Sequence, residues 1–148
     1  MSRPLIALDT NLLIYAHNAD SPWHAAARRS IENLANASAA WAIPWPCVHE
    51  FLAVATNPKL VAGPEAVEGA VRQVELWMES PTLWLLGELA GHWAELRTIL
   101  EAGALRGGAV HDARIAAICR EHGVTELWSA DRDFSRVRGL RVRNPLID

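Results

Sequence analysis

Acidic residues stand at four places in this 148-residue chain where their neighbours are apolar. Asp9 ends the apolar run LIAL, and Asp131 follows the segment ELWSA. Glu50 lies among apolar residues of a predicted helix, and Asp112 lies in the first turn of another. Carboxylates that meet at one place repel one another unless protons or a cation intervene. Whether these four meet therefore decides which chemistry the chain can perform.

Each acid also has a purely structural interpretation. An aspartate at the end of a strand often caps the helix that follows, which would account for Asp9 and Asp131. The dipole of a helix favours a negative charge in its first turn, where Asp112 falls. Glutamate is almost never fully buried unless it is paired, so Glu50 either reaches solvent at a helix end or meets a cationic group.

The chemistry open to clustered carboxylates is metal-assisted. Hard divalent ions take oxygen ligands, and Mg²⁺ binds through one or two carboxylates, several waters and substrate phosphates. Such a site can activate water and stabilise the charge of an in-line displacement at phosphorus. If the four acids converge, the sequence predicts a phosphodiesterase.

The elements that would position these acids alternate along the chain. Short strands are predicted at residues 4–9, 82–87, 126–130 and 140–144, of which the first two are expected to be buried and the last to lie at an edge of the sheet. WAIPWP is expected to form at most a brief strand, because proline interrupts it twice. Helices are predicted at residues 11–18, 21–37, 47–57, 63–79, 88–103 and 110–123. In the second helix, Ser21 is the expected N-cap, with Pro22 at the first helical position.

This alternation predicts one α/β domain over residues 1–148, with a mainly parallel, Rossmann-like sheet flanked by helices. In open sheets of this kind, sites form beyond the carboxyl ends of the strands. Asp9 and Asp131 follow two such strands, so we expect them at the same edge.

Composition narrows the class of protein. Hydrophobic residues make up 51% of the chain and charged residues 21%, as in a compact globular domain. No apolar run approaches the ~18 residues of a membrane span, and the first ten residues do not form a signal peptide. Cys47 and Cys119 lack paired metal spacing, so reduced core thiols in a cytoplasmic protein are expected.

Other possible ligands give weaker signals. No pair of histidines has HExxH spacing, so a zinc site is not predicted. The seven tryptophans could stack on bases, but packing in the core and at interfaces is their commoner use. No glycine-rich phosphate loop is present, and Asn11 occupies the position where haloacid-dehalogenase phosphatases need a second aspartate.

Four sequence blocks resemble those of the PIN-domain ribonucleases and, within them, the VapC toxins of bacterial type II toxin–antitoxin pairs. The blocks are LDTNLLIYA, HEFLAVATNP, VHDARIAAI and WSADRDF, in that order and over nearly the whole chain. The resemblance implies a PIN domain and an endoribonuclease that cleaves RNA phosphodiester bonds. It also implies a cytoplasmic enzyme with no membrane association.

The resemblance assigns roles to individual residues. The catalytic acids would be Asp9, Glu50, Asp112 and Asp131, with Asp9 and Asp112 as the direct metal ligands. Supporting positions would be Thr10, Asn11, Ser129 and Asp133. Arg114, one helical position from the site, or the arginines near the C-terminus are candidates to contact the RNA backbone.

The same resemblance implies the cofactor and the partners. Mg²⁺ would be bound, with Mn²⁺ as a possible substitute, and a small cognate antitoxin would silence the enzyme. Residues 22–56 could supply apolar helical surface for that partner, and a homodimer is expected. The alternative from another class is a catalytically inactive PIN-fold binding module that acts through protein–protein contacts.

Overall fold

The computed structural model describes residues 4–132, 134, 137 and 139–147. The strands are β1 (Ile6–Leu8), β2 (Trp41–Pro44), β3 (Leu83–Leu86), β4 (Glu126–Trp128) and β5 (Val142–Arg143). The helices are α1 (Thr10–His17), α2 (His24–Asn36), α3 (Trp45–Ala55), α4 (Ala66–Met78), α5 (His92–Gly103) and α6 (Ala109–Glu121). The predicted alternation of strands and helices is confirmed.

The strands form one parallel sheet in the order β3-β2-β1-β4-β5. From the central β1 the chain moves outward to β2 and β3, and then crosses to β4 and β5 on the other side. The order therefore reverses between β1 and β4. In an open α/β sheet, a crevice forms at the carboxyl ends of the strands at this reversal, and Asp9 and Ser129 directly follow those two ends.

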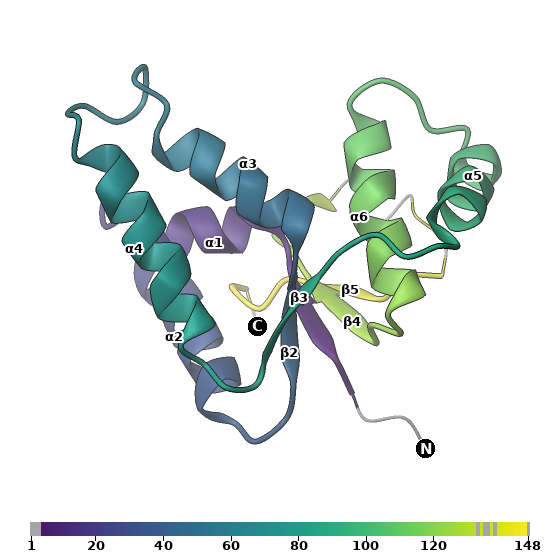
Figure 1. The fold of residues 1–148 in the computed structure, drawn as a ribbon, viewed down its shortest axis with the longest axis horizontal. Coiled ribbons are helices and arrows are strands. Elements are labelled where there is room, and N and C mark those ends of the chain that lie inside the picture. Colours follow the sequence, from purple (N-terminus) through teal and green to yellow (C-terminus); the bar gives the residue numbers. More distant parts are fainter. Residues whose placement is uncertain (1–3, 133, 135–136, 138, 148) are drawn as a thin grey trace.

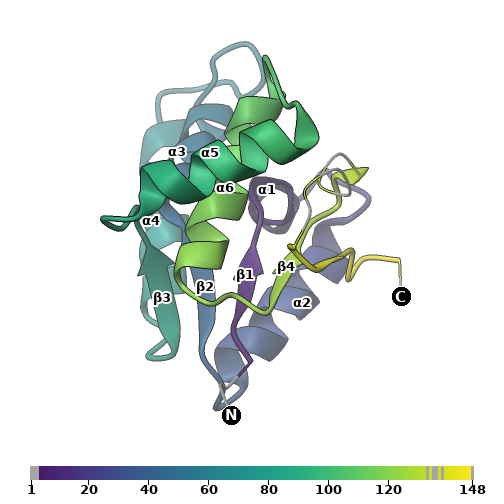
Figure 2. The ribbon, with the colours of Figure 1, turned by 90° about the vertical axis from the view of Figure 1, so that its right-hand side faces the viewer.

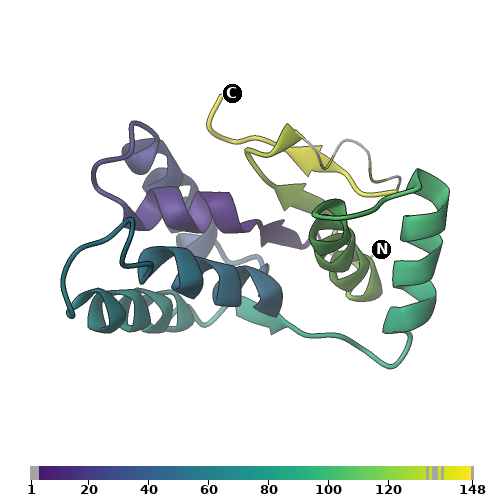
Figure 3. The ribbon, with the colours of Figure 1, turned by 90° about the horizontal axis from the view of Figure 1, so that it is seen from above.

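The helices form two layers (Figures 1 and 2). Helices α1 to α4 lie on one side of the sheet, and helices α5 and α6 lie on the other side. The view from above shows β1 between the two layers (Figure 3). Because the long crossover from β3 to β4 carries α5 and α6, the reversal point lies where the two layers meet.

Apolar side chains from both layers bury the sheet. The largest fully buried side chains include Trp41, Phe51, Leu12 and Ile118. The ring of Phe51 packs edge-on against Trp77 of α4 with centroids 5.0 Å apart, and this contact joins two helices of the first layer. The core thus fixes α1 and α3 in place, and these helices carry Thr10 and Glu50 of the candidate site.

The structure differs from the sequence prediction at two elements. α2 begins at His24 rather than near Pro22, because Ser21 accepts a hydrogen bond from the backbone N–H of Trp23 in a turn before the helix. The strand β3, predicted to be buried, lies at the edge of the sheet, and Trp84 within it is 63% exposed. WAIPWP does contain a brief strand, which ends at Pro44.

Candidate functional site

Asp9 is the centre of the candidate site. It follows β1 and is the N-cap of α1, with its Oδ1 accepting the backbone N–H of Thr10 at 2.8 Å. Its side chain points inward, and the residue is only 5% exposed. The helix-cap interpretation is therefore correct, but it accounts for only one of the two carboxylate oxygens.

The second oxygen of Asp9 binds residues from the other end of the chain. Oδ2 accepts from Ser129 Oγ at 2.7 Å and from Asn11 Nδ2 at 3.3 Å. Asn11 also accepts the backbone N–H of Ala130 at 3.1 Å, and Ser129 Oγ accepts that of Asp131 at 3.0 Å. These bonds fasten the segment after β4 to the start of α1, as the sequence predicts for residues that follow neighbouring parallel strands.

Glu50 joins the site through a hydroxyl group. Thr10 Oγ1 donates a hydrogen bond to Glu50 Oε2 at 2.6 Å. Although its helix is largely apolar, Glu50 is exposed, so of the two alternatives the glutamate reaches solvent. The bond connects α3 to the residue that follows Asp9.

The other predicted residues are placed less completely. Asp112 lies in the first turn of α6 and is half-buried. Its neighbour His111 lines a cleft together with Glu50, which brings that turn of α6 to the candidate site. Asp133 lies outside the described residues.

The electrostatics of Asp9 reflect its crowded position. Burial raises the pKa of Asp9 above its ordinary value, and the hydrogen bonds from Ser129 and Thr10 oppose that rise. The neighbouring carboxylates of Glu50 and Asp131 raise the pKa further. Three of the four predicted acids are therefore close enough to interact, and their mutual repulsion favours a cation between them.

Two cysteines lie beneath the site. Cys47 Sγ is 3.8 Å from Asp9 Oδ1 and donates to it. Burial raises the pKa of Cys47 well above its ordinary value, and the negative charge of Asp9 adds to the rise. Because metal ligation requires the thiolate, Cys47 acts as a hydrogen-bond donor, and the donors that remain for a metal are carboxylate oxygens.

The residues present fit a hard divalent ion. In the part of the chain that the structure describes, no three His, Cys, Asp or Glu side chains are grouped so that they alone could hold a metal. Mg²⁺ needs only one or two carboxylates, with waters and substrate phosphates completing its shell. Asp9, with the carboxylates of Glu50 and Asp131 near it, supplies the oxygen chemistry that such an ion prefers.

A cleft of about 410 Å³ opens between α3 and α6 beside Glu50. From α3 it is lined by Pro46, His49, Glu50 and Ala53, and from α6 by His111, Arg114 and Ile115. The sequence analysis did not assign His49 and His111 to the site. Each of these histidines directly precedes a predicted catalytic acid in the chain, Glu50 or Asp112, and this adjacency could have identified them from the sequence.

Most tryptophans are not in the core. Trp41, Trp77 and Trp128 are buried as expected, whereas the others are exposed: Trp23, Trp45, Trp84 and Trp93. Packing in the core therefore accounts for fewer than half of the seven. Trp45 is the one that begins α3, four residues before His49.

This fold is that of a known family. The PIN domain family model matches residues 6–140, so the chain belongs to the PIN-domain family. Among curated proteins it is 34% identical over 137 residues to Ribonuclease VapC48 of Mycobacterium tuberculosis, covering 93% of this chain and 94% of that one. It is also 34% identical over 142 residues to Ribonuclease VapC43 of the same organism, covering 96% of each.

Solved structures show the same fold. VapBC2 from Rickettsia felis, bound to a DNA fragment from its promoter, has a TM-score of 0.67 at 22% identity and covers 95% of this chain and 98% of that chain. VapC20 of Mycobacterium tuberculosis, a toxin that cleaves the sarcin-ricin loop, has a TM-score of 0.65 at 18% identity over 88% and 92%. The predicted PIN fold and the likeness to VapC-type proteins are confirmed.

Proposed function

We propose that this protein is a divalent-metal-dependent endoribonuclease of the VapC type, the toxic component of a type II toxin–antitoxin pair. Its catalytic acids are Asp9, Glu50, Asp112 and Asp131. The similarity to VapC ribonucleases along nearly the whole chain supports the reaction class. RNA is the substrate, and the cytoplasm, where thiols stay reduced, is the compartment.

One observation carries the proposal. The buried carboxylate of Asp9 lies at the reversal point of the sheet, with Glu50 and Asp131 close enough to raise its pKa further after burial has raised it. A carboxylate in this position costs folding free energy. A site that keeps such a group is expected to use it, because perturbed carboxyl groups gather where function needs them.

In this proposal Asp9 and Asp112 hold a divalent ion, which we take to be Mg²⁺, with Mn²⁺ as a substitute. When bound, such an ion stabilises charge on the phosphate and lowers the pKa of water for attack. Ser129 and Asn11 fix the orientation of Asp9 through its Oδ2. Thr10 holds Glu50 at the mouth of the cleft, and Asp133 is proposed to assist.

A small antitoxin is the proposed protein partner. Several solved structures with this fold are toxin–antitoxin complexes, including one from Klebsiella pneumoniae. Between α1, α3 and α4 the surface carries a groove of about 630 Å³, lined partly by Leu60 and Val61, and Leu60 is 68% exposed. Exposed apolar side chains beside a groove are typical of a surface that a partner covers.

No described helix is long and apolar enough to cross a membrane.

The test is cleavage of RNA by the purified protein. We expect a mixture of cellular RNAs to be cut with Mg²⁺ or Mn²⁺, cleavage to stop with EDTA, and activity to return when Mg²⁺ is restored. Asp9→Asn should abolish cleavage, and Asp20→Asn, which changes an exposed aspartate in the turn between α1 and α2, should not. Full activity in chelator would refute the proposal.

The same preparation separates the enzyme from the alternative of an inactive binding module. A module would cut no RNA with any divalent ion and would still bind its partner. Light scattering of the isolated chain tests the proposed homodimer, for which a monomer at all concentrations is the contrary result.

A further inference from the structure

One wall of the cleft between α3 and α6 carries His49, whose ring is in tilted contact with that of Trp45 beside the cleft. Trp45 begins α3, and His49 follows one helical turn later on the same side. Their ring centroids are 5.9 Å apart, and the planes are inclined by 32°. Trp45 is 37% exposed, and His49 is exposed beside Glu50. A large aromatic surface thus remains accessible next to a proposed catalytic acid.

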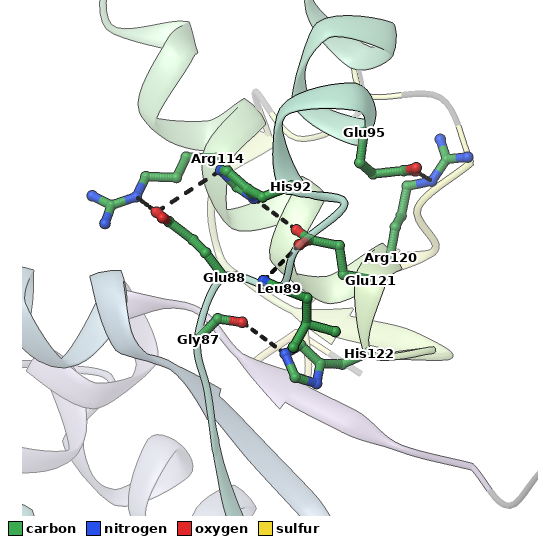
Figure 4. A network of polar contacts seen from close by, with 9 residues as sticks. All are labelled: Gly87, Glu88, Leu89, His92, Glu95, Arg114, Arg120, Glu121 and His122. Atoms are coloured by element: carbon green, nitrogen blue, oxygen red, sulfur yellow. Dashed lines mark hydrogen bonds and ion pairs between the residues drawn. The ribbon is translucent and has the colours of Figure 1, made fainter.

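The opposite wall carries a fixed cation. Arg114 of α6 lines the cleft, and its Nε donates to Glu88 Oε1 at 3.0 Å. Figure 4 shows the terminal nitrogens of its guanidinium group pointing away from Glu88. Both side chains of this pair are more than two-fifths exposed, and pairs of this kind contribute only ~0–1 kcal/mol to stability. The pair therefore adds little to folding stability, and it leaves the terminal nitrogens of Arg114 available for a further contact.

One loop supports both walls. Trp45 Cδ1 lies 3.8 Å from the point where a Cβ on Gly87 would be, so the indole ring rests against that backbone. The next residue is Glu88, which holds Arg114. The loop is itself fastened to the end of α6, where His122 Nε2 bonds Gly87 O at 2.7 Å (Figure 4). This loop therefore contacts Trp45 through Gly87 and Arg114 through Glu88.

This pairing of groups matches a nucleotide. A guanidinium group recognises phosphate geometry, and aromatic rings stack on unpaired bases of any sequence. We propose that the cleft is a nucleotide subsite beside the acidic centre, in which Arg114 contacts a phosphate and the Trp45–His49 pair stacks on an adjacent unpaired base. Glu88 is a positioning residue that acts through Arg114. The inference rests on the proposed function, because it takes RNA as the substrate.

The test measures binding apart from cleavage. A short fluorescein-labelled single-stranded RNA is titrated with the protein in EDTA, and the Kd is read from fluorescence anisotropy. Trp45→Ala should weaken binding by at least about 5-fold, and Trp45→Phe should retain most of the affinity. The matched controls are Trp84→Ala, which removes a tryptophan 63% exposed on β3, and Arg97→Ala, which removes an arginine in an exposed ion pair on α5. Both controls should bind as the wild type does.

The salt dependence distinguishes the phosphate contact from a structural role. Each phosphate neutralised on a single strand contributes about −0.7 to the slope of log K against log salt concentration. Arg114→Ala should make that slope shallower by about 0.7, whereas Trp45→Ala should leave it unchanged. In cleavage assays Glu88→Gln should raise KM with kcat unchanged. Circular dichroism melts check that each variant is folded.

The outcomes separate this inference from the proposed function. If the wild type binds no single-stranded RNA, or if Trp45→Ala and Arg114→Ala bind as tightly as the wild type, the subsite is wrong even when RNA is cleaved. An unchanged salt slope in Arg114→Ala overturns the phosphate contact. If no divalent ion supports cleavage and both variants still lose affinity as expected, the proposed enzyme fails and the subsite stands.

Discussion

The hydroxyl group of Ser129 donates to Oδ2 of Asp9 at 2.7 Å, across 120 positions of sequence. Both residues are almost fully buried. The bond joins the ends of β1 and β4, the two strands between which the order of the sheet reverses. It is also the strongest of the interactions that oppose the effect of burial on the Asp9 carboxylate.

Ser129→Ala should destabilise the protein in a pH-dependent way. Removing a hydrogen bond to a buried charged group lowers the free energy of unfolding by about 1.5–3 kcal/mol at neutral pH. Without the hydroxyl, the pKa of Asp9, already raised by burial, rises further. At acidic pH the carboxyl group is protonated in both proteins, so the difference between them should shrink.

Urea unfolding at neutral and acidic pH measures this difference. The control is Ser30→Ala, which removes a hydroxyl group bonded to Ala26 O within α2 at 3.0 Å. That variant should show a small change that is independent of pH. A loss in Ser129→Ala that stays constant as the pH falls would contradict the assignment.

Asp9→Asn should separate stability from activity. Burial raises the pKa of Asp9 above the ordinary 3.8, so the unfolded chain ionises this group at a lower pH than the folded protein does. The stability contributed by the protonated group is lost as the pH rises through the folded pKa. The neutral amide avoids this loss, but its NH₂ group replaces one of two oxygens that both accept hydrogen bonds. The melting temperature at neutral pH should therefore stay close to that of the wild type.

Cleavage by Asp9→Asn should fall by more than about 100-fold, beyond the usual cost of losing an outer-shell partner of a metal. Thermal unfolding as a function of pH and an RNA cleavage assay on the same preparation give both readouts. A variant that is inactive because it is unfolded would show a low melting temperature, and that result would count against this prediction.

The two cysteines should be unreactive in the folded protein. Burial raises the pKa of Cys119 to about 12, with Asp9 adding to the rise, and both thiols are buried. The thiolate is the nucleophile, so a small maleimide at mildly alkaline pH should label neither residue until denaturant is added. Mass spectrometry counts the adducts.

The same shifts predict alkaline instability. The unfolded chain releases its thiol protons near the ordinary pKa of 9.0, whereas folded Cys119 keeps its proton to about 12. Stability should therefore fall as the pH rises across that interval. Rapid labelling of one thiol in the native protein would contradict both expectations.

The ends of α5 and α6 offer a matched pair of backbone tests. Each helix is followed by a residue with left-handed backbone, Ala104 at φ 47° and Gly123 at φ 70°. A side chain in this conformation costs roughly 1–2 kcal/mol. Ala104→Gly should therefore raise the free energy of unfolding, and Gly123→Ala should lower it, each by about 1 kcal/mol. Chemical denaturation that gives the same sign for both variants would refute the argument.

The sequence predicted the order of the elements because their periodicity is local. The apolar run before Asp9 forms strand β1, and the segment 110–123 with helical spacing forms most of helix α6 and the turn after it. The start of α2 was misplaced because Ser21 can cap a turn as well as a helix. That β3 lies at the edge of the sheet depends on the order of the strands, which no single segment encodes.

Part of the site was also predictable, because the ends of two strands could be recognised from the sequence. Asp9 and Asp131 could be placed together from the rule for parallel strands. The bond from Thr10 to Glu50 required knowledge of how α3 packs against α1. The contact between the rings of Trp45 and His49 and the hydrogen bond from Arg114 to Glu88 depend on how a loop and two helices pack in three dimensions.

The late position of Ser129 in the chain has a consequence for biosynthesis. A nascent polypeptide that has been translated only as far as α6 has Asp9, Glu50 and Asp112 but has neither β4 nor the hydroxyl group that orients Asp9. The acidic centre proposed above is therefore complete only after β4 and Ser129 have been synthesised and have packed beside β1.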